Sequence, residues 1–257
     1  MKLLQLICLS SLMLFTSSCA QLAPGDSSKL TPAQRTNEVA EANLHLGIAY
    51  LQQGEYEKSL EKLNRALEAD SKYPPTYNAL GLLYQKLGKS AEAEKNFKHA
   101  LSLSPNDSLS LNNYGQFLCS STRYTEAGEV FDKAAANPLN DAPEIALTNA
   151  GVCKLKQDEP DRAEEYFRKA LDKNPRVPLA LLQMTQLSYD QANYLSARGY
   201  LQRYLEVAKH TPTTLWLGIL IEKELGDKNT LSSYALQLKN NYPDSREAAL
   251  LKESNIK

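Results

Sequence analysis

Only a few residues of this 257-residue chain have the type and spacing that chemistry requires, and the cysteines come first. Cys119 and Cys153 lie 34 residues apart, while Cys8 and Cys19 belong to the N-terminal end of the chain. Two thiols can form a disulfide, join further ligands around a metal, or pack as small apolar groups. No Cys-x-x-Cys pair or nearby histidine supplies further ligands, so a metal site is the least favoured of these uses.

The sequence carries no pattern of a known catalytic mechanism. It has no HExxH, GxSxG or GxxxxGK segment. These motifs would indicate a zinc site with a general base, a nucleophilic serine and a phosphate-binding loop, respectively. His45, His99 and His210 lie in different segments without a shared partner, and Glu164-Glu165 belongs to a polar helix surface. We expect a protein that is not an enzyme, with no cofactor, no metal and no small-molecule substrate.

The charges of the chain are balanced. There are 29 lysines and arginines against 30 aspartates and glutamates, a formal net charge of −1. Nucleic-acid binding needs basic side chains matched to phosphates, whereas here basic and acidic residues are interleaved. We therefore expect solvated helix faces and no nucleic-acid partner.

A repeated pattern of small and aromatic residues predicts the elements that position these side chains. The repeats begin at Ala40, Pro74, Ser108, Glu144, Pro178 and Pro212, at intervals of 34 residues apart from one of 36. In the second repeat, Gly81, Ala93, Phe97 and Ala100 occupy the places that recur in the other copies. A period of this length predicts stacked helix pairs, and the small residues let two antiparallel helices approach closely. The longer interval places a two-residue insertion near residues 137–143.

These residues resemble the tetratricopeptide repeat, over residues 40–245. The resemblance implies an all-α fold, a right-handed superhelical solenoid of six repeats whose first helices line a concave surface. A helical pattern over Ser245–Glu253 predicts a short helix that caps the last repeat. We divide the chain into a signal peptide (1–18), an anchor and tether (19–39, flexible over 21–37), the six repeats (40–245) and a cap with tail (246–257).

The first nineteen residues lie outside the repeats and have the pattern of an export signal. Met1-Lys2 gives a positive start, and residues 3–15 are mostly apolar but too few to span a bilayer. The following Thr16-Ser17-Ser18-Cys19 resembles a bacterial lipoprotein signal, which implies a lipidated Cys19. Ala20 is not the aspartate that retains such proteins in the inner membrane, which implies the periplasmic face of the outer membrane of a Gram-negative bacterium. The alternatives are an ordinary secretory leader or a cytosolic protein.

Export decides how the remaining two cysteines are interpreted, because disulfides persist in oxidising compartments. Cys119 and Cys153 fall on facing sides of neighbouring first helices, at the twelfth place of the third repeat and the tenth of the fourth. We expect a disulfide between them, worth about 3–4 kcal/mol in the chain-entropy model. Two buried free thiols remain the alternative.

Two segments of the middle repeats resemble a particular family. They are Asn112–Cys119 and Asn149–Cys153, in six repeats directly behind a lipid anchor, and they resemble the type IV pilus biogenesis lipoproteins PilW and PilF, called pilotins. The resemblance implies a non-enzymatic lipoprotein that binds the pilus secretin and promotes its outer-membrane localisation and multimerisation. The alternative is a repeat lipoprotein that serves as a scaffold for peptidoglycan enzymes or for outer-membrane protein assembly.

The binding surface is expected where first-helix side chains point into the concave groove. These residues are Leu44, Ile48, Leu51, Asn78, Leu82, Gln85, Asn112 and Gln116. The groove would be apolar in the first repeat, and its amides would pair with the backbone of an extended protein segment further along. Alternatively, Asn78 and Asn112 only contact water.

Overall fold

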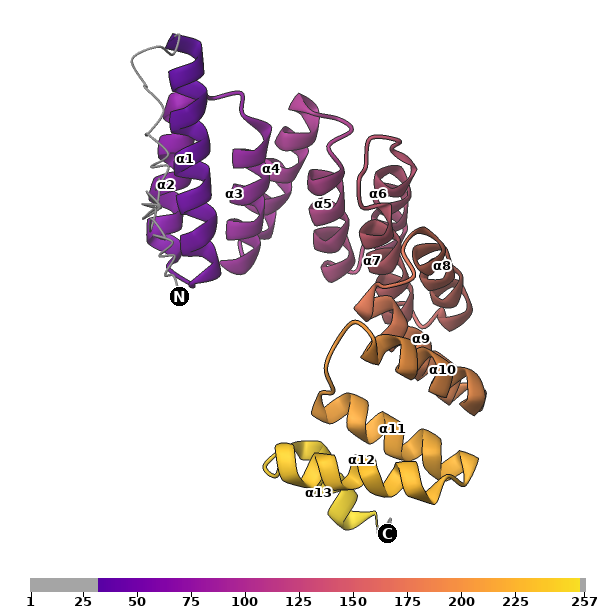
Figure 1. The fold of residues 1–257 in the computed structure, drawn as a ribbon. Helices are drawn as coiled ribbons and strands as arrows, with labels where there is room; N and C mark the ends of the chain where they lie inside the picture. Colours follow the sequence, from indigo (N-terminus) through magenta and orange to yellow (C-terminus); the bar gives the residue numbers. More distant parts are fainter. Residues whose placement is uncertain (1–31, 255–257) are drawn as a thin grey trace, which may run out of the picture.

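The computed structural model describes residues 32–254, which form thirteen α-helices and no strand. Consecutive helices pack in pairs along a curved array (Figure 1). The helices are α1 (Pro32–Gln52), α2 (Tyr56–Ala69), α3 (Pro74–Lys86), α4 (Ser90–Leu103), α5 (Ser108–Ser120), α6 (Tyr124–Ala136), α7 (Pro143–Lys156), α8 (Pro160–Lys173), α9 (Pro178–Asp190), α10 (Tyr194–Leu205), α11 (Pro212–Leu225), α12 (Lys228–Asn241) and α13 (Arg246–Glu253). The predicted all-α array of helix pairs is confirmed.

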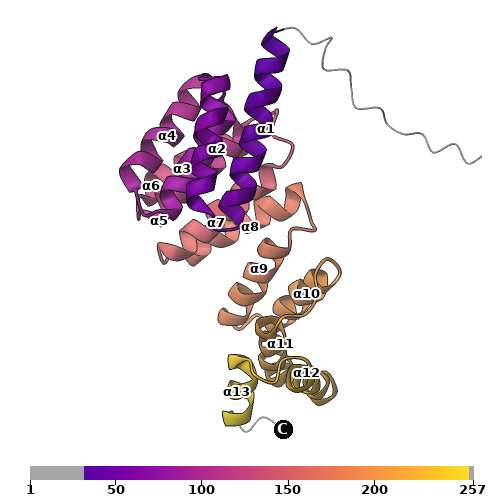
Figure 2. The same ribbon diagram turned by 90° about the vertical axis from the view of Figure 1, so that its left-hand side faces the viewer.

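The first helix is longer than the sequence predicts. α1 begins at Pro32, so the predicted flexible tether over residues 21–37 is wrong for residues 32–37, which are helical. Proline suits the first position of a helix, and Ala33, Gln34 and Arg35 are good helix formers. Figure 2 shows α1 extending past α2 at this end. Cys19 and the predicted signal peptide lie outside the described residues, and among the described helices none is long and apolar enough to cross a membrane.

The insertion in the repeat lies in one loop. α6 ends at Ala136 and α7 begins at Pro143. The corresponding connection one repeat earlier runs only from Leu103 to Ser108. The two extra residues therefore lengthen the loop over residues 137–142 and leave the helices on either side in register.

In the first four repeats, a glycine of the first helix faces a large apolar side chain of the second helix. In the second, third and fourth repeats a Cβ on Gly81, Gly115 or Gly151 would lie 2.6–2.7 Å from the ring of the opposing phenylalanine. The pairs at these places are Gly47/Leu63, Gly81/Phe97, Gly115/Phe131, Gly151/Phe167, Thr185/Leu201 and Ile219/Ala235. The larger member lies on the second helix in the first five repeats and on the first helix in the sixth, and volume-conserving exchanges of this kind keep a core filled.

The turn between the two helices of each repeat uses a left-handed backbone. The residue at this place is Gly54, Gly88 or Gly226 in three repeats, with φ of 77°, 71° and 75°. In the other three it is Thr122, Asp158 or Ala192, with φ of 60°, 59° and 59°. The glycines adopt this conformation readily and aspartate tolerates it, whereas Thr122 and Ala192 carry a strain of about 1–2 kcal/mol each.

The array ends in the predicted capping helix. Ser245 is the N-cap of α13 and accepts a hydrogen bond from the backbone of Ala248. Ala248 and Leu251 are buried in one cluster with Leu215, Ile219 and other residues of α11 and α12. α13 therefore covers apolar surface that the last repeat would otherwise expose, as terminal elements of repeat proteins must.

Candidate protein-binding surface

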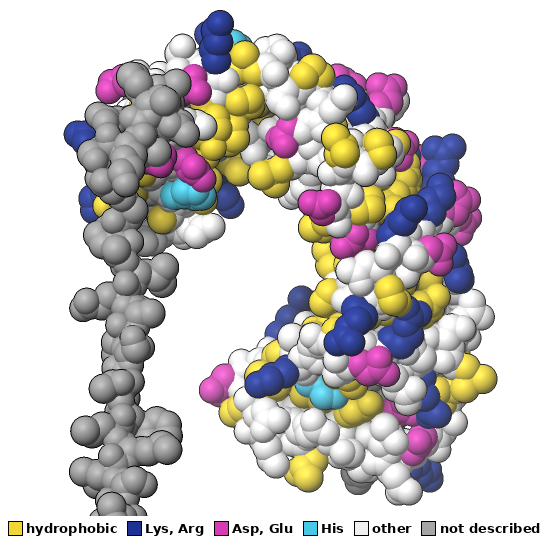
Figure 3. All heavy atoms as spheres, turned by 45° about the horizontal axis from the view of Figure 1, so that its top comes forward, with side chains coloured by type: hydrophobic (Ala, Val, Ile, Leu, Met, Phe, Trp, Pro, Cys, Tyr) yellow, Lys and Arg dark blue, Asp and Glu magenta, His cyan; other side chains and the backbone are white. Residues whose placement is uncertain are grey.

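The first helices of the repeats line the inside of the curve, and from α3 to α12 the second helices lie outside it (Figure 1). Figure 3 shows hydrophobic side chains along the inner edge of the hollow that the array encloses. This surface is the predicted groove. Its accessible side chains, however, differ from those the sequence predicts.

Three predicted groove residues are buried between repeats. Leu44 is 4% exposed, Asn78 5% and Asn112 9%. The prediction that they line an accessible groove is therefore wrong for Leu44 and Asn78, because the first helix of the next repeat covers them. Asn112 is covered in the same way by α7, but it still lines a small hollow between α5 and α7. Of the other predicted residues, Gln116 is exposed, whereas Ile48, Leu51, Leu82 and Gln85 are half-buried on the inner surface.

The buried asparagines form hydrogen bonds from one repeat to the next. Asn113 Nδ2 donates to Asn78 Oδ1 at 3.2 Å, and Asn149 Nδ2 donates to Asn112 Oδ1 at 2.8 Å. Each bond joins the fifth place of one first helix to the sixth place of the next. Sequence reasoning missed Asn113 and Asn149 as partners, although their recurrence at the same place was a signal. These amides fix the spacing of α3, α5 and α7.

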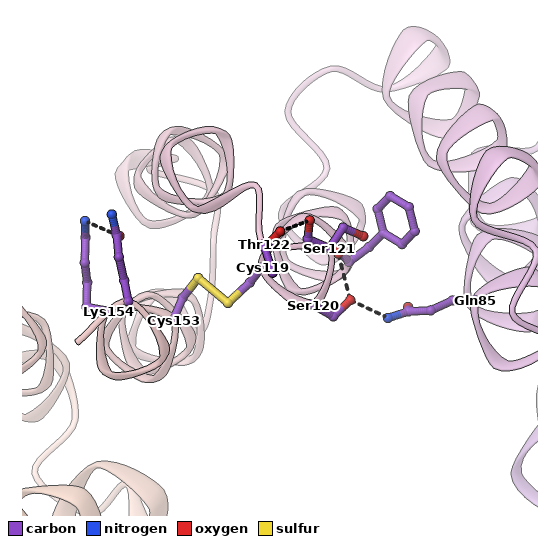
Figure 4. The surroundings of a disulfide bond; sticks show 9 residues. Gln85, Cys119, Ser120, Ser121, Thr122, Cys153 and Lys154 are labelled. Carbon is purple, nitrogen blue, oxygen red and sulfur yellow. Dashed lines mark hydrogen bonds between the residues drawn. A yellow bond between two sulfur atoms is a disulfide. The ribbon is translucent and has the colours of Figure 1, made fainter. Parts of the chain in front are cut away.

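The predicted cysteine pair lies on the same three-helix segment. The structure joins Cys119 of α5 to Cys153 of α7 in a disulfide with a Cα–Cα distance of 5.9 Å (Figure 4). Both residues are buried, in a cluster with Phe117 and Phe131. Ser120, next to Cys119, accepts a hydrogen bond from Gln85 of α3 at 3.3 Å. Covalent and polar links therefore connect the same consecutive first helices.

The accessible apolar residues of the inner surface lie at another place of the repeat. Leu109, Ile145 and Leu179 occupy the second place of three consecutive first helices and are 61%, 50% and 42% exposed. Exposed large apolar residues in register are uncommon unless they contact something. The sequence could have indicated this row, because the second place lies three residues before the fifth and therefore on the same face of the first helix, but these residues were not among those predicted.

The charged groups of the array form structural contacts. Glu94 of α4 accepts hydrogen bonds from Arg123 and Tyr114 and pairs with Lys98 at 2.7 Å. Hydrogen bonds from Lys98 and Arg123 lower the pKa of Glu94 to about 2. Glu222 of α11 is 2% exposed and receives a two-pronged contact from Arg198 of α10. Each carboxylate therefore has an arginine partner across a repeat boundary.

The histidines are far apart and have different surroundings. His45 and His99 are exposed, on α1 and α4. His210 is half-buried before α11, with Nδ1 3.3 Å from Thr214 Oγ1, and burial lowers its pKa. His210 is therefore partly enclosed, unlike the other two histidines. Residues 32–254 contain no group of three or more histidine, cysteine or acidic side chains arranged to hold a metal.

Outside the curve, a polar hollow of about 470 Å³ lies between α6 and α8. Tyr166 OH donates to both carboxylate oxygens of Asp132, at 3.0 and 3.2 Å. Burial, with the nearby charge of Asp132, raises the pKa of Tyr166 to about 12. Acidic and basic residues alternate around this hollow, so it has no clear preference for a partner of one charge.

Comparison with known repeat families defines the class of protein. A model described as TPR repeat matches residues 47–88, and models of the tetratricopeptide repeat match residues 74–107 and 149–212. The chain is a tetratricopeptide-repeat protein whose inner surface presents apolar side chains.

Individual relatives narrow this class to one family. The type IV pilus assembly protein PilF of Pseudomonas aeruginosa is 33% identical over 223 residues, which cover 87% of this chain and 88% of the relative. The solved structure of P. aeruginosa PilF matches with a TM-score of 0.75 at 32% identity, over 86% of this chain and 100% of that one. PilW, a widely conserved type IV pilus biogenesis factor, matches with a TM-score of 0.72 at 30% identity, over 84% and 99%. The chain therefore belongs to the PilF/PilW family of type IV pilus assembly proteins.

Proposed function

We propose that this protein is an outer-membrane lipoprotein adaptor, a pilotin, which binds the pilus secretin and promotes its localisation and multimerisation. The observation that carries the proposal is the match to PilF, a type IV pilus assembly protein, over 87% of the chain. The exposed apolar row on the inner surface supports it, because a groove of this kind suits a protein segment better than a small molecule. The protein acts by binding and not by catalysis.

The anchor supplies the transport step of this mechanism. Cys19 would carry two or three acyl chains, and each buried methylene contributes about 0.8 kcal/mol, so more than one chain holds a protein on a membrane. The described helices need not enter the bilayer, since the lipid alone attaches the protein. A secretin subunit held on the inner surface would then reach the outer membrane with the anchor.

Deletion of the gene in its piliated host tests the proposal. We expect loss of surface pili and of detergent-resistant secretin multimers, with normal secretin monomer levels and normal cell shape. Complementation with wild type should restore multimers, whereas Cys19→Ala should leave a folded protein and mislocalised secretin. Unchanged multimers after deletion would contradict the proposal. A dominant envelope or division defect with normal multimers would favour the scaffold alternative.

A further inference from the structure

The lengthened loop before α7 presents a leucine to solvent on a hydrogen-bonded backbone. Leu139 is 86% exposed, the highest value among the large apolar residues described. Asn137 Nδ2 donates to Asn106 O and Ser108 Oγ, at 2.8 and 3.0 Å. Asn140 Nδ2 donates to Ala134 O at 2.8 Å, and both asparagine side chains accept from loop amides. These bonds hold residues 137–142, so the exposure of Leu139 follows from a defined loop conformation.

Two adjoining hollows lie beside this loop. The smaller, of about 160 Å³, is mostly apolar in lining and lies between α5 and α7, with Leu109 and Ile145 at its wall. The larger, of about 460 Å³, includes Leu139 and shares Ser108, Leu109, Asn140 and Ala142 with the first. A cavity of roughly 150 Å³ can hold benzene, so the smaller hollow has room for one aliphatic or aromatic side chain.

The charges around the hollows have one sign. Asp107 and Asp141 line the larger hollow, and the residues described around both hollows include no lysine or arginine. Asp107 accepts from the backbone of Ser110 at 2.8 Å, which fixes its position at the start of α5. Ser104 and Asn106 lie at the same rim and can pair with the backbone of an extended segment.

We propose that these hollows bind an extended protein segment in which an aliphatic or aromatic residue is followed closely by a lysine or arginine. The apolar side chain enters the smaller hollow against Leu109 and Ile145, Leu139 covers it, and the cation meets Asp107 and Asp141. This inference rests on the proposed function in one respect, that the occupant is a protein, and it places the contact in the third and fourth repeats. An anionic membrane or a second copy of this surface would bring like charges together.

Selection of peptides tests the inference without assuming the secretin. A library of random peptides of about twelve residues is selected on the purified full-length protein in detergent, and enriched peptides are measured by fluorescence polarisation at two salt concentrations. We expect enrichment of an apolar residue with a lysine or arginine within about three positions. Ile145→Ser and Leu139→Ser should each weaken binding by about tenfold, the effect of losing a contact near the centre of an interface.

Charge variants and controls complete the experiment. Asp107→Asn retains the capping oxygen, and together with Asp141→Asn it should weaken binding several-fold and remove most of its salt dependence. Leu195→Ser on α10, where the leucine is 72% exposed, and Asp244→Asn should leave binding unchanged. Circular dichroism checks that each variant is folded.

Three results would overturn the inference: no enriched peptide, peptides rich in acidic residues, or binding that is equal in all variants. Normal secretin multimers after gene deletion would instead overturn the proposed function and leave this site intact. The two failures are therefore distinguishable.

Discussion

The second to fourth repeats and the last two are held together in different ways. In the middle of the array, glycine packs against phenylalanine within each helix pair, asparagine bonds to asparagine across two repeat boundaries, and one disulfide joins the third and fourth repeats. In the fifth and sixth repeats the glycine has been replaced by Thr185 and Ile219, and a single buried carboxylate, Glu222, is paired with Arg198 across the boundary. The same arrangement of helices can therefore be stabilised by many small contacts or by one buried ion pair.

This difference determines how each region should respond to a substitution. In the middle repeats, a substitution removes only one of several small contacts. In the last repeats, removal of the arginine leaves a buried carboxylate without its partner, which costs more stability. The last repeats should thus be sensitive at one position, and the middle repeats moderately sensitive at several.

The largest effect is expected for Arg198→Met. It leaves Glu222, 2% exposed, without its partner, and such a loss costs about 3–5 kcal/mol. The matched control is Arg123→Met in the middle repeats, where the arginine is 32% exposed and its partner Glu94 25%, so a much smaller loss of stability is expected. Urea unfolding gives both values, and hydrogen exchange should show the loss within residues 178–241. Equal losses would remove the distinction between the regions.

Removal of the disulfide by Cys119→Ala with Cys153→Ala should cost about 3–4 kcal/mol, because the unfolded chain gains the freedom of a closed loop. The stability of wild type in reducing agent should approach that of the double variant, and reducing agent should not change the double variant. If reductant leaves wild type unaffected, the two thiols are unpaired in the protein.

Gly115→Thr should destabilise the third repeat by about 1–3 kcal/mol through overpacking, because a Cβ there would lie 2.7 Å from the Phe131 ring. Adding Phe131→Leu reproduces the Thr185/Leu201 pair and should recover at least half of the loss. The control is Gly128→Ala, where an added Cβ meets nothing within 4 Å and a gain of about 0.5–1 kcal/mol is expected. No recovery in the double variant would show that the pairs are not interchangeable.

Asn112→Leu should cost about 1–3 kcal/mol, because the amide of Asn149 loses its partner in a partly buried place. Combining it with Asn149→Leu should cost less than the sum of the two single changes. A double-mutant cycle by urea unfolding measures this coupling. Additive losses would mean that the inter-repeat bond makes no contribution to stability.

The smallest effect is expected at a turn. Ala192→Gly should raise stability by about 1 kcal/mol, because Ala192 has a φ of 59° in a place where glycine adopts the left-handed conformation without strain. Thermal unfolding measures the change, and Gly88→Ala, at the same place in the second repeat, should show the opposite sign. A loss of stability in Ala192→Gly would indicate that the alanine methyl makes a contact that outweighs the strain.

The positions of the helix pairs were predictable from the sequence, because the repeat period and the small residues depend only on packing within one pair. Gly81 and Ala93 indicate close approach whatever the rest of the array does. The accessibility of Asn78 and Asn112 was not predictable in the same way, since it depends on how far the next repeat rotates over the fifth place. Likewise, glycines marked three of the turns, but nothing in the residue types of Thr122 or Ala192 indicated that they share the same backbone conformation.

The complementary volumes of the paired residues on the two helices of a repeat also restrict how such an array can evolve. A lineage that passes from a pair such as Gly115/Phe131 to one such as Ile219/Ala235 must change both members. Each single step either overfills the space or leaves it empty, so the two positions are epistatic. Recombination that exchanges whole repeats keeps both members together and avoids that barrier, which makes the repeat, and not the residue, the unit that is inherited intact.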